Sequence, residues 1–146
     1  MNPKIAIYLR AATESQNEDA MARQCHAVAA YVLKHGGSIQ DIFVDRDGSG
    51  MGPHGVAFTD MLAGCQKKMF EVLIVSDLSR ISRDLVKLTT ALKTFNALGV
   101  RVIGVTDGYD SARTSGPLSP KLTHKWLDFQ ITPRVRAQRQ TLRQSK

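Results

Sequence analysis

Three arginines follow two apolar segments of the chain and together could handle a phosphate group. Arg10 follows the apolar run 5–9, and Arg80 and Arg83 follow the run 70–75. A guanidinium group always carries its charge and matches phosphate oxygens with two parallel N–H donors. Three such groups at one phosphodiester would stabilise the extra charge of a phosphoryl-transfer transition state without a metal. Each arginine taken singly is more often an ordinary surface charge.

The alternation of apolar segments predicts how these arginines are positioned. Predicted strands cover 5–9, 39–44, 70–75 and 100–105, and predicted helices cover 17–35, 56–66 and 84–98. This order indicates an α/β fold of three αβα layers, with a mostly parallel sheet of four to five strands. In such sheets, ligands bind where the carboxyl end of a strand leads into the next helix. We therefore expect the arginines at one edge of the sheet.

Two segments between the predicted strands carry further expectations. The helix 17–35 is expected to begin at Asn17 as its N-cap. Its apolar face is expected to contain residues at helical spacing, namely Met21, Cys25, Val28 and Val32. The glycine-rich segment 45–55 lacks a Gly-Lys-Ser/Thr sequence, which argues against a P-loop. It is either a surface loop or a loop that closes over a phosphate or a DNA strand.

The composition changes after residue 105, which predicts three parts: a domain over 1–110, a linker and C-terminal helix over 111–132, and a basic tail over 133–146. Ser119-Pro120 is typical of a helix start. The apolar stripe of this helix packs either on its own sheet or on a second subunit, and it consists of Leu122, Trp126 and Phe129. Pro133 is expected to end the helix.

The tail has no acidic residue and carries four candidate DNA-binding side chains, Arg134, Arg136, Arg139 and Arg143. Contacts of this kind to a phosphate backbone add affinity that depends on salt. The alternative is a solvated terminal tail. The whole chain has 20 Lys and Arg against 13 Asp and Glu, a net charge of +7, which favours an acidic partner such as nucleic acid.

Other features of the sequence narrow the class of protein. Cys25 and Cys65 form neither a disulfide framework nor a zinc pattern, so we expect a reducing, cytoplasmic location. We expect no signal peptide and no membrane span, because no apolar run is long enough. We also expect no cofactor and no metal ion.

Two motifs resemble those of the serine recombinases, the resolvase and invertase family. Residues 8–13, Tyr-Leu-Arg-Ala-Ala-Thr, followed by Gln16, are similar to its Tyr-x-Arg-x-Ser-Thr-x-x-Gln signature. Residues 78–84, Leu-Ser-Arg-Ile-Ser-Arg-Asp, are similar to its Leu-Asp-Arg-Leu-Ser-Arg-Asp motif. Residues 47–50 resemble its acidic, glycine-containing loop. The order and spacing also fit, and the resemblance covers residues 3–130.

The resemblance implies a catalytic domain that cuts DNA with a serine, forms a 5′-phosphoserine linkage and rejoins the strands without ATP. It implies that arginines activate the serine and steady the phosphate. Four residues match active-site positions of the family, namely Arg10, Gln16, Arg80 and Arg83. It further implies DNA as a partner and dimers that pair into tetramers through a long helix after the sheet.

Three positions depart from the family pattern. The nucleophile position is Ala12, whose methyl group cannot attack phosphorus, and Ser79 stands where the motif has aspartate. Gly55-Val56 replaces an Arg-Pro pair, so another arginine is missing. Thr13 and Ser15 are nearby hydroxyls, but Thr13 matches the family's own threonine. Ala12 alone would fit an engineered inactivation, whereas the three departures together fit a naturally degenerate member.

We therefore expect a serine recombinase-like domain that does not cleave DNA as written. Its expected partners are DNA and either a second copy, as a homodimer or tetramer, or a related recombinase. The alternative is a non-catalytic DNA-binding or recombinase-partner module. A nucleotide- or flavin-binding domain would have a similar layer order, but it would not explain the paired arginines. Because Pro133 shortens the linking helix and we expect no helix-turn-helix domain, recognition of a specific site is not expected.

Overall fold

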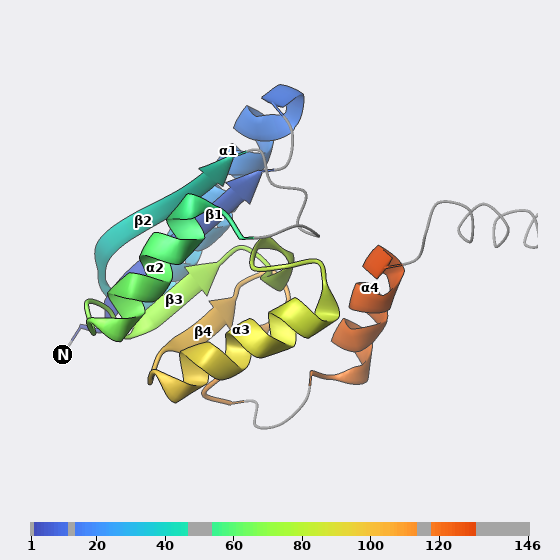
Figure 1. Cartoon of the computed structure of the whole chain (residues 1–146). Coiled ribbons are helices and arrows are strands. Elements are labelled where there is room, and N and C mark those ends of the chain that lie inside the picture. Colours follow the sequence, from blue (N-terminus) through green and yellow to red (C-terminus); the bar gives the residue numbers. More distant parts are fainter. Residues whose placement is uncertain (1, 12–13, 47–53, 114–117, 131–146) are drawn as a thin grey trace, which may run out of the picture.

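The computed structural model describes residues 2–11, 14–46, 54–113 and 118–130, and a five-stranded sheet forms its centre (Figure 1). The strands are β1 (Lys4–Ala11), β2 (Ser38–Arg46), β3 (Val72–Val75), β4 (Arg101–Gly104) and β5 (Tyr109–Asp110). Their order in the sheet is β2-β1-β3-β4-β5. The first four strands run parallel, and β5 pairs antiparallel with β4. The prediction of a mostly parallel sheet is therefore confirmed.

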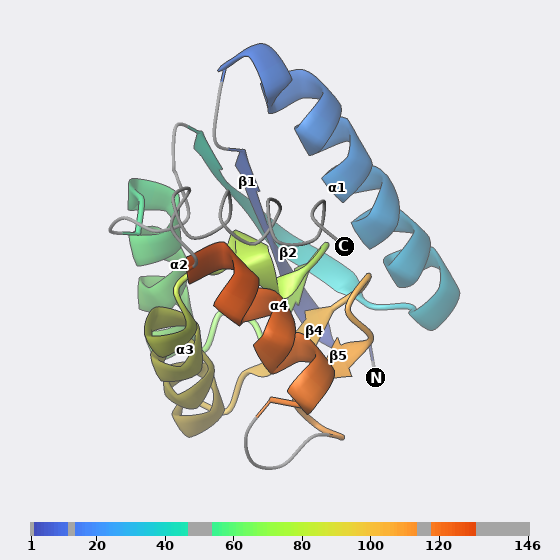
Figure 2. The ribbon, with the colours of Figure 1, turned by 90° about the vertical axis from the view of Figure 1, so that its right-hand side faces the viewer.

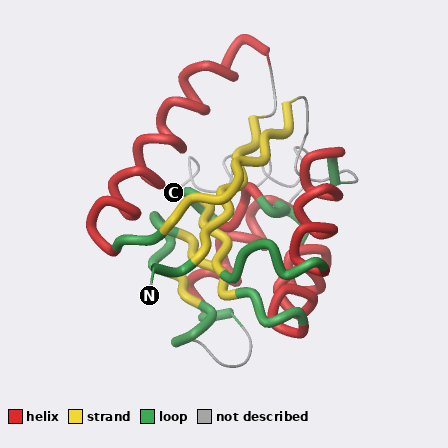
Figure 3. The backbone as a smooth tube through the Cα atoms, turned by 90° about the vertical axis from the view of Figure 1, so that its left-hand side faces the viewer, coloured by secondary structure: helices red, strands yellow, loops and turns green. Residues whose placement is uncertain are grey.

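Helices cover both faces of this sheet. They are α1 (Glu14–His35), α2 (Val56–Gln66), α3 (Leu85–Ala97) and α4 (Pro120–Gln130). Helix α1 lies alone on one face, and the other helices lie on the opposite side (Figures 2 and 3). Each face has its own buried apolar cluster, one around Met21 and Val28 of α1 and one around Phe58 and Phe95 of α2 and α3. The three predicted layers are thus confirmed.

The register of the sheet places Arg10 beyond the end of its neighbour β3. Ile7 of β1 lies opposite Ile74, and β3 ends one residue later at Val75. On its other side, β1 stays paired with β2 as far as Ala11. One flank of β1 is therefore open at Arg10, and the segment that follows β3 lies close to it there.

The structure corrects two expectations for α1. The helix begins at Glu14, so the prediction of Asn17 as its N-cap is wrong. Cys25 is exposed, whereas Gln24 is buried beside Met21 and Val28. Residues 21, 24 and 28 lie on one face of a helix because 3.6 residues complete a turn. The apolar face thus contains a buried glutamine in place of the predicted cysteine.

The second predicted strand is also more exposed than its apolar residues suggested. Strand β2 lies at the edge of the sheet, and Ile39, Ile42 and Val44 remain well exposed. Helix α1 packs chiefly on β1 and β3, which leaves this face of β2 uncovered.

The C-terminal helix packs within its own chain. Ser119 accepts a hydrogen bond from the N–H of Leu122 at 3.3 Å, as expected for a helix start. The Trp126 side chain is fully buried, and Leu122 and Phe129 pack against the same core cluster. Of the two alternatives for this apolar stripe, the structure shows packing within the chain. Pro133 and the basic tail lie outside the described residues.

No helix in the described part of the chain has the length and apolar character needed to cross a membrane.

Candidate functional site

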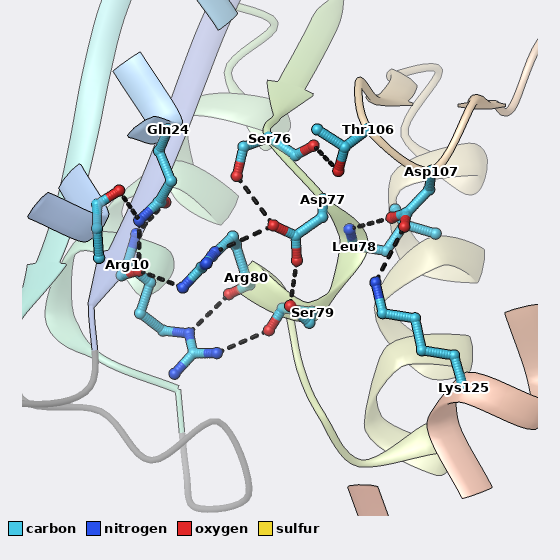
Figure 4. Close-up of polar contacts among 11 residues, drawn as sticks. Arg10, Gln24, Ser76, Asp77, Leu78, Ser79, Arg80, Thr106, Asp107 and Lys125 are labelled. Atoms are coloured by element: carbon cyan, nitrogen blue, oxygen red, sulfur yellow. Dashed lines mark hydrogen bonds and ion pairs between the residues drawn. The ribbon is translucent and has the colours of Figure 1, made fainter. Parts of the chain in front are cut away.

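Arg10 and Arg80 bind each other's backbone across the open flank of β1 (Figure 4). The Arg10 side chain donates from Nε to the carbonyl of Arg80 at 2.9 Å and from Nη2 to the carbonyl of Ser79 at 2.7 Å. In return, Nη1 of Arg80 donates to the carbonyl of Arg10 at 3.1 Å. These bonds join the carboxyl ends of β1 and β3. We call Arg10, Arg80 and Arg83 the arginine cradle.

A short 3-10 helix, η1 (Leu78–Arg80), presents these carbonyls to Arg10. Leu78 and Ile81 anchor the segment because both side chains are buried in the core. The N–H of Leu78 donates to Oδ2 of Asp107 at 2.6 Å, and the other carboxylate oxygen of Asp107 accepts from Lys125 of α4 at 3.1 Å. The backbone that carries Arg80 is thus held from the core and from the loop after β4.

Gln24 of α1 completes the hydrogen bonding of β1 where β3 no longer reaches. Its Oε1 accepts from the N–H of Arg10 at 3.1 Å, and its Nε2 donates to the carbonyl of Arg10 at 2.9 Å. Gln24 is only 2% exposed. Buried amide groups need partners of this kind, since an unpaired backbone group in the interior is costly. Gln24 therefore fixes the backbone of Arg10 from the other face of the sheet.

The arginines are close enough to influence one another's charge. Burial lowers the pKa of Arg10, and the positive charges of Arg80 and Arg83 lower it further, while Asp77 raises it. An arginine in a protein nevertheless keeps its proton. Repulsion between the guanidinium groups is therefore not relieved by loss of a proton. An anion bound between them would reduce that repulsion, as expected for a phosphate site.

Arg83 is held by α4 and not by the 3-10 helix. Its guanidinium carbon lies 4.8 Å from the centre of the Phe129 ring, a cation–π contact. Beside it, the indole N–H of Trp126 donates to the carbonyl of Ser82 at 2.8 Å. Since η1 ends at Arg80, Arg80 and Arg83 do not share a helical face, as they would have done in a continuous helix.

Asp45 at the end of β2 holds the start of α2 against β1. Its carboxylate accepts from the Tyr8 hydroxyl at 2.7 Å and from the N–H groups of Ala57 and Phe58 at 2.9 and 3.0 Å. A Cβ atom at Gly55 would clash with this carboxylate. Gly55, which stands where the family motif has arginine, has no Cβ atom and therefore leaves room for the Asp45 carboxylate.

The serines next to the cradle are buried and already bonded. Ser76, Ser79 and Ser82 are 4%, 7% and 2% exposed. The hydroxyls of Ser76 and Ser79 donate to Asp77, and the hydroxyl of Ser82 accepts from the N–H of Asp84. Within the described ranges there is also no group of three or more His, Cys, Asp or Glu side chains placed to hold a metal ion. The arrangement can bind an anion, but these serines do not present a nucleophile to it.

The predicted site residues are only partly within the described structure. Arg10, Ser79, Arg80 and Arg83 lie together at one end of the sheet, and Gln16 belongs to the first turns of α1. Ala12 and the tail arginines lie outside the described residues.

Sequence reasoning missed three residues whose side chains form hydrogen bonds at this end of the sheet: Gln24, Asp45 and Asp77. Two of them left a signal in the sequence. Gln24 lies at helical spacing between two apolar positions, and Asp77 immediately precedes the second motif. Asp45 ends an apolar strand, but nothing in its neighbourhood indicates that it caps a helix eleven residues later.

Comparisons with known proteins agree with this fold and these motifs. The catalytic domain of TP901-1 integrase is similar to this chain with a TM-score of 0.70 and 20% identity, over 96% of this chain and 98% of that domain. A resolvase family site-specific recombinase from Streptococcus pneumoniae has a TM-score of 0.67 and 22% identity, over 99% and 96% of the two chains. The catalytic domain of ISC1926 TnpA, an IS607-like serine recombinase, has a TM-score of 0.64 and 20% identity, over 70% of each chain.

These structural similarities, at such low identity, show a shared fold. No curated protein sequence matches the chain. The family described as "Resolvase, N terminal domain" matches residues 5–145, which is nearly the whole sequence and includes both motifs. The resemblance inferred from the motifs is therefore confirmed, and the chain belongs to the resolvase N-terminal domain family.

Proposed function

We propose that this chain is a serine recombinase-type domain that binds DNA at backbone phosphates and does not cut it. The observation that supports this proposal is the reciprocal bonding of Arg10 and Arg80, which keeps a cluster of arginines at the carboxyl ends of β1 and β3. The position that carries the serine of the family signature, position 12, is alanine.

The exposure of the cradle fits a phosphate ligand. The side chain of Arg80 is 27% exposed, and among the described residues its Nη2 has no hydrogen-bond partner. Arg83 is exposed as well. A phosphodiester oxygen that accepts from Nη2 would gain a charge-assisted hydrogen bond from a guanidinium that is already oriented. The net charge of +7 would favour DNA over neutral ligands.

Cleavage would need a nucleophile, and the described residues around the cradle do not present one. Alanine at position 12 has no group that can attack phosphorus, and the serines at 76, 79 and 82 are buried and bonded. Uncatalysed cleavage of a phosphodiester is too slow to matter. The same arrangement suits a non-catalytic partner of a related recombinase. Replacing Ala12 with serine distinguishes such a module from an enzyme that lacks only its nucleophile.

We further propose that the tail arginines at 134, 136, 139 and 143 lie along the DNA backbone, and that the chain forms a homodimer or tetramer or pairs with a related recombinase. Because Trp126 is buried in its own chain, a second subunit would have to contact the other side of α4, where Leu127 is 52% exposed.

Replacing Arg80 with glutamine tests whether the cradle is the DNA site. We expect Arg80→Gln to weaken binding to a short duplex tenfold or more, because a charge-assisted hydrogen bond contributes about 1.5–3 kcal/mol. The slope of log affinity against log salt should fall by about 0.9. Both quantities can be measured by fluorescence anisotropy over a salt series.

Arg113→Gln is the matched control. Arg113 is 86% exposed and lies beside Asp110, which pairs with Arg101 at the amino end of β4, far from Arg10 and Arg80. This variant removes the same charge and should affect binding much less than Arg80→Gln. Equal losses for the two variants would mean that net charge, and not the cradle, binds DNA.

A further inference from the structure

We propose that Asp77 is a positioning residue of the arginine cradle and supplies, from two residues earlier, the carboxylate that the family motif carries at position 79. The proposal rests on the proposed function in one respect, that the cradle is the phosphate site. It concerns a residue that belongs to neither of the two motifs.

The Asp77 carboxylate contacts the side chains of Ser76, Ser79 and Arg80 (Figure 4). Its Oδ2 accepts from Nε of Arg80 at 3.3 Å and from the hydroxyl of Ser76 at 3.1 Å. Its Oδ1 accepts from the hydroxyl of Ser79. The Asp77 side chain is only 15% exposed, so solvent competes little for these bonds.

Two contacts from different segments orient the guanidinium of Arg80. Asp77 binds it at Nε, and the carbonyl of Arg10 binds it at Nη1. The guanidinium is planar and rigid, so contacts at two of its nitrogens fix the orientation of the whole group. The third nitrogen, Nη2, is then directed by the protein before any ligand arrives. Preorganisation of this kind lowers the entropy lost on binding a phosphate.

Asp77 also balances the charge of the cradle. Its own burial raises the pKa of its carboxyl group, but the hydrogen bond from Ser79 and the charge of Arg80 lower that pKa by more, so the net shift is downward. The group is therefore ionised at neutral pH. Other nearby carboxylates are used elsewhere, since Asp107 binds Leu78 and Lys125 while Asp45 binds the start of α2. Asp77 instead contacts Arg80 of the cradle directly.

Ser79 takes part in the same contacts through its hydroxyl group. A serine at this position removes the carboxylate of the family motif, but its hydroxyl donates to the carboxylate of Asp77. The pair Asp77 and Ser79 thus takes the place of one aspartate at 79. One of the three departures from the family pattern is then compensated, and the cradle keeps its acidic partner.

The test moves the carboxylate from position 77 to position 79. Three variants are compared with the unchanged chain, namely Asp77→Asn, Ser79→Asp and the double variant Asp77→Asn/Ser79→Asp. The Nε–Hε resonance of Arg80, identified by its absence in Arg80→Gln, reports on the contact in the free protein without DNA. We expect Asp77→Asn to shift this resonance and speed its exchange with water, and the double variant to restore slow exchange.

Asp107→Asn is the control for a merely structural effect. Asp107 is 5% exposed and binds the backbone of Leu78, but it contacts no arginine of the cradle. It should lower stability and leave the Arg80 resonance in place. An unchanged resonance in Asp77→Asn, or an equal change in Asp107→Asn, would overturn the proposal. If Asp77→Asn does not fold, Asp77→Ser, which also removes the carboxylate and keeps a small polar side chain, replaces it, and an unchanged Arg80 resonance there has the same meaning.

The rate of covalent linkage to DNA gives a second test of the role of Asp77. In a chain that carries Ala12→Ser, we expect Asp77→Asn to slow covalent linkage to DNA by about tenfold to a hundredfold, because small misplacements of catalytic groups cost this much. Moving the carboxylate to position 79 should recover much of the rate. If Ala12→Ser itself forms no linkage, the domain is not an enzyme that lacks only its nucleophile, while the Arg80 resonance still decides the role of Asp77.

Discussion

Replacing Ala12 with serine is expected to give a protein–DNA linkage that survives denaturation, whereas the chain with alanine gives none. The serine Oγ would bond to the phosphorus, the bond from phosphorus to the 3′ oxygen would break, and the proton would pass to the leaving 3′-hydroxyl. The cradle would stabilise the charge that develops on the phosphate. This expectation follows from the reciprocal contacts of Arg10 and Arg80, which do not require residue 12.

The linkage can be scored on a denaturing gel after incubation with supercoiled plasmid DNA and with a pool of random-sequence duplexes. The random pool removes the need to know a target site. Ala12→Ser/Arg80→Gln is the control and should form no linkage, since it has the hydroxyl without the complete cradle. No linkage with Ala12→Ser would mean that the glycine at 55, or the absence of a partner subunit, leaves the site unable to support attack. The reading as a non-catalytic module would then be favoured.

Trp126→Ala is expected to lower the free energy of unfolding by about 3–5 kcal/mol, the range found for large aromatic residues removed from a core. Trp126 is fully buried, and its ring meets Phe129 edge-on with centroids 5.6 Å apart. The substitution would leave a cavity under α4 and would also leave the carbonyl of Ser82 without its indole donor. Phe129 belongs to the same helix as Trp126 and contacts Arg83, so the position of the Arg83 side chain should change as well.

Urea unfolding followed by circular dichroism measures this loss. Leu127→Ala is the matched control, because Leu127 is on the same helix and half exposed, and its removal should cost less than about 1 kcal/mol. Trp126→Phe keeps most of the apolar contact and removes the hydrogen bond, so it should cost about 1 kcal/mol more than a pure packing change. Equal small losses for Trp126→Ala and Leu127→Ala would show that α4 does not pack on its own chain in solution.

The layers of this fold could be predicted because they depend on local patterns. Alternating apolar strands and amphipathic helices specify a parallel sheet with both faces covered. The predicted helix 84–98 matches α3, and Asp84 caps it by accepting from the N–H groups of Val86 and Lys87. The start of α1 could not be predicted in this way. A cap such as Asn17 contributes only about 1 kcal/mol, which other contacts can override.

The parts of the site that the sequence did not reveal depend on contacts between distant segments. Gln24 is buried because β3 ends before the level of Arg10, a consequence of sheet register and not of the sequence around residue 24. Asp77 contacts Arg80 because the 3-10 helix after β3 places side chains that are three residues apart on the same side. The exposed face of β2 likewise follows from its place at the edge of the sheet. Motif spacing located the arginines but not the residues that orient them.

Arginine side-chain resonances of the unchanged chain show whether the arginine cradle binds DNA phosphate. Nε–Hε signals are followed while a short duplex is added at several salt concentrations. We expect the signals of Arg80 and Arg83 to shift on addition of DNA and these shifts to shrink as salt rises, while the signals of Arg101 and Arg113 at the opposite end of the sheet stay in place. Shifts confined to the tail arginines, with Arg80 and Arg83 unchanged, would contradict this expectation.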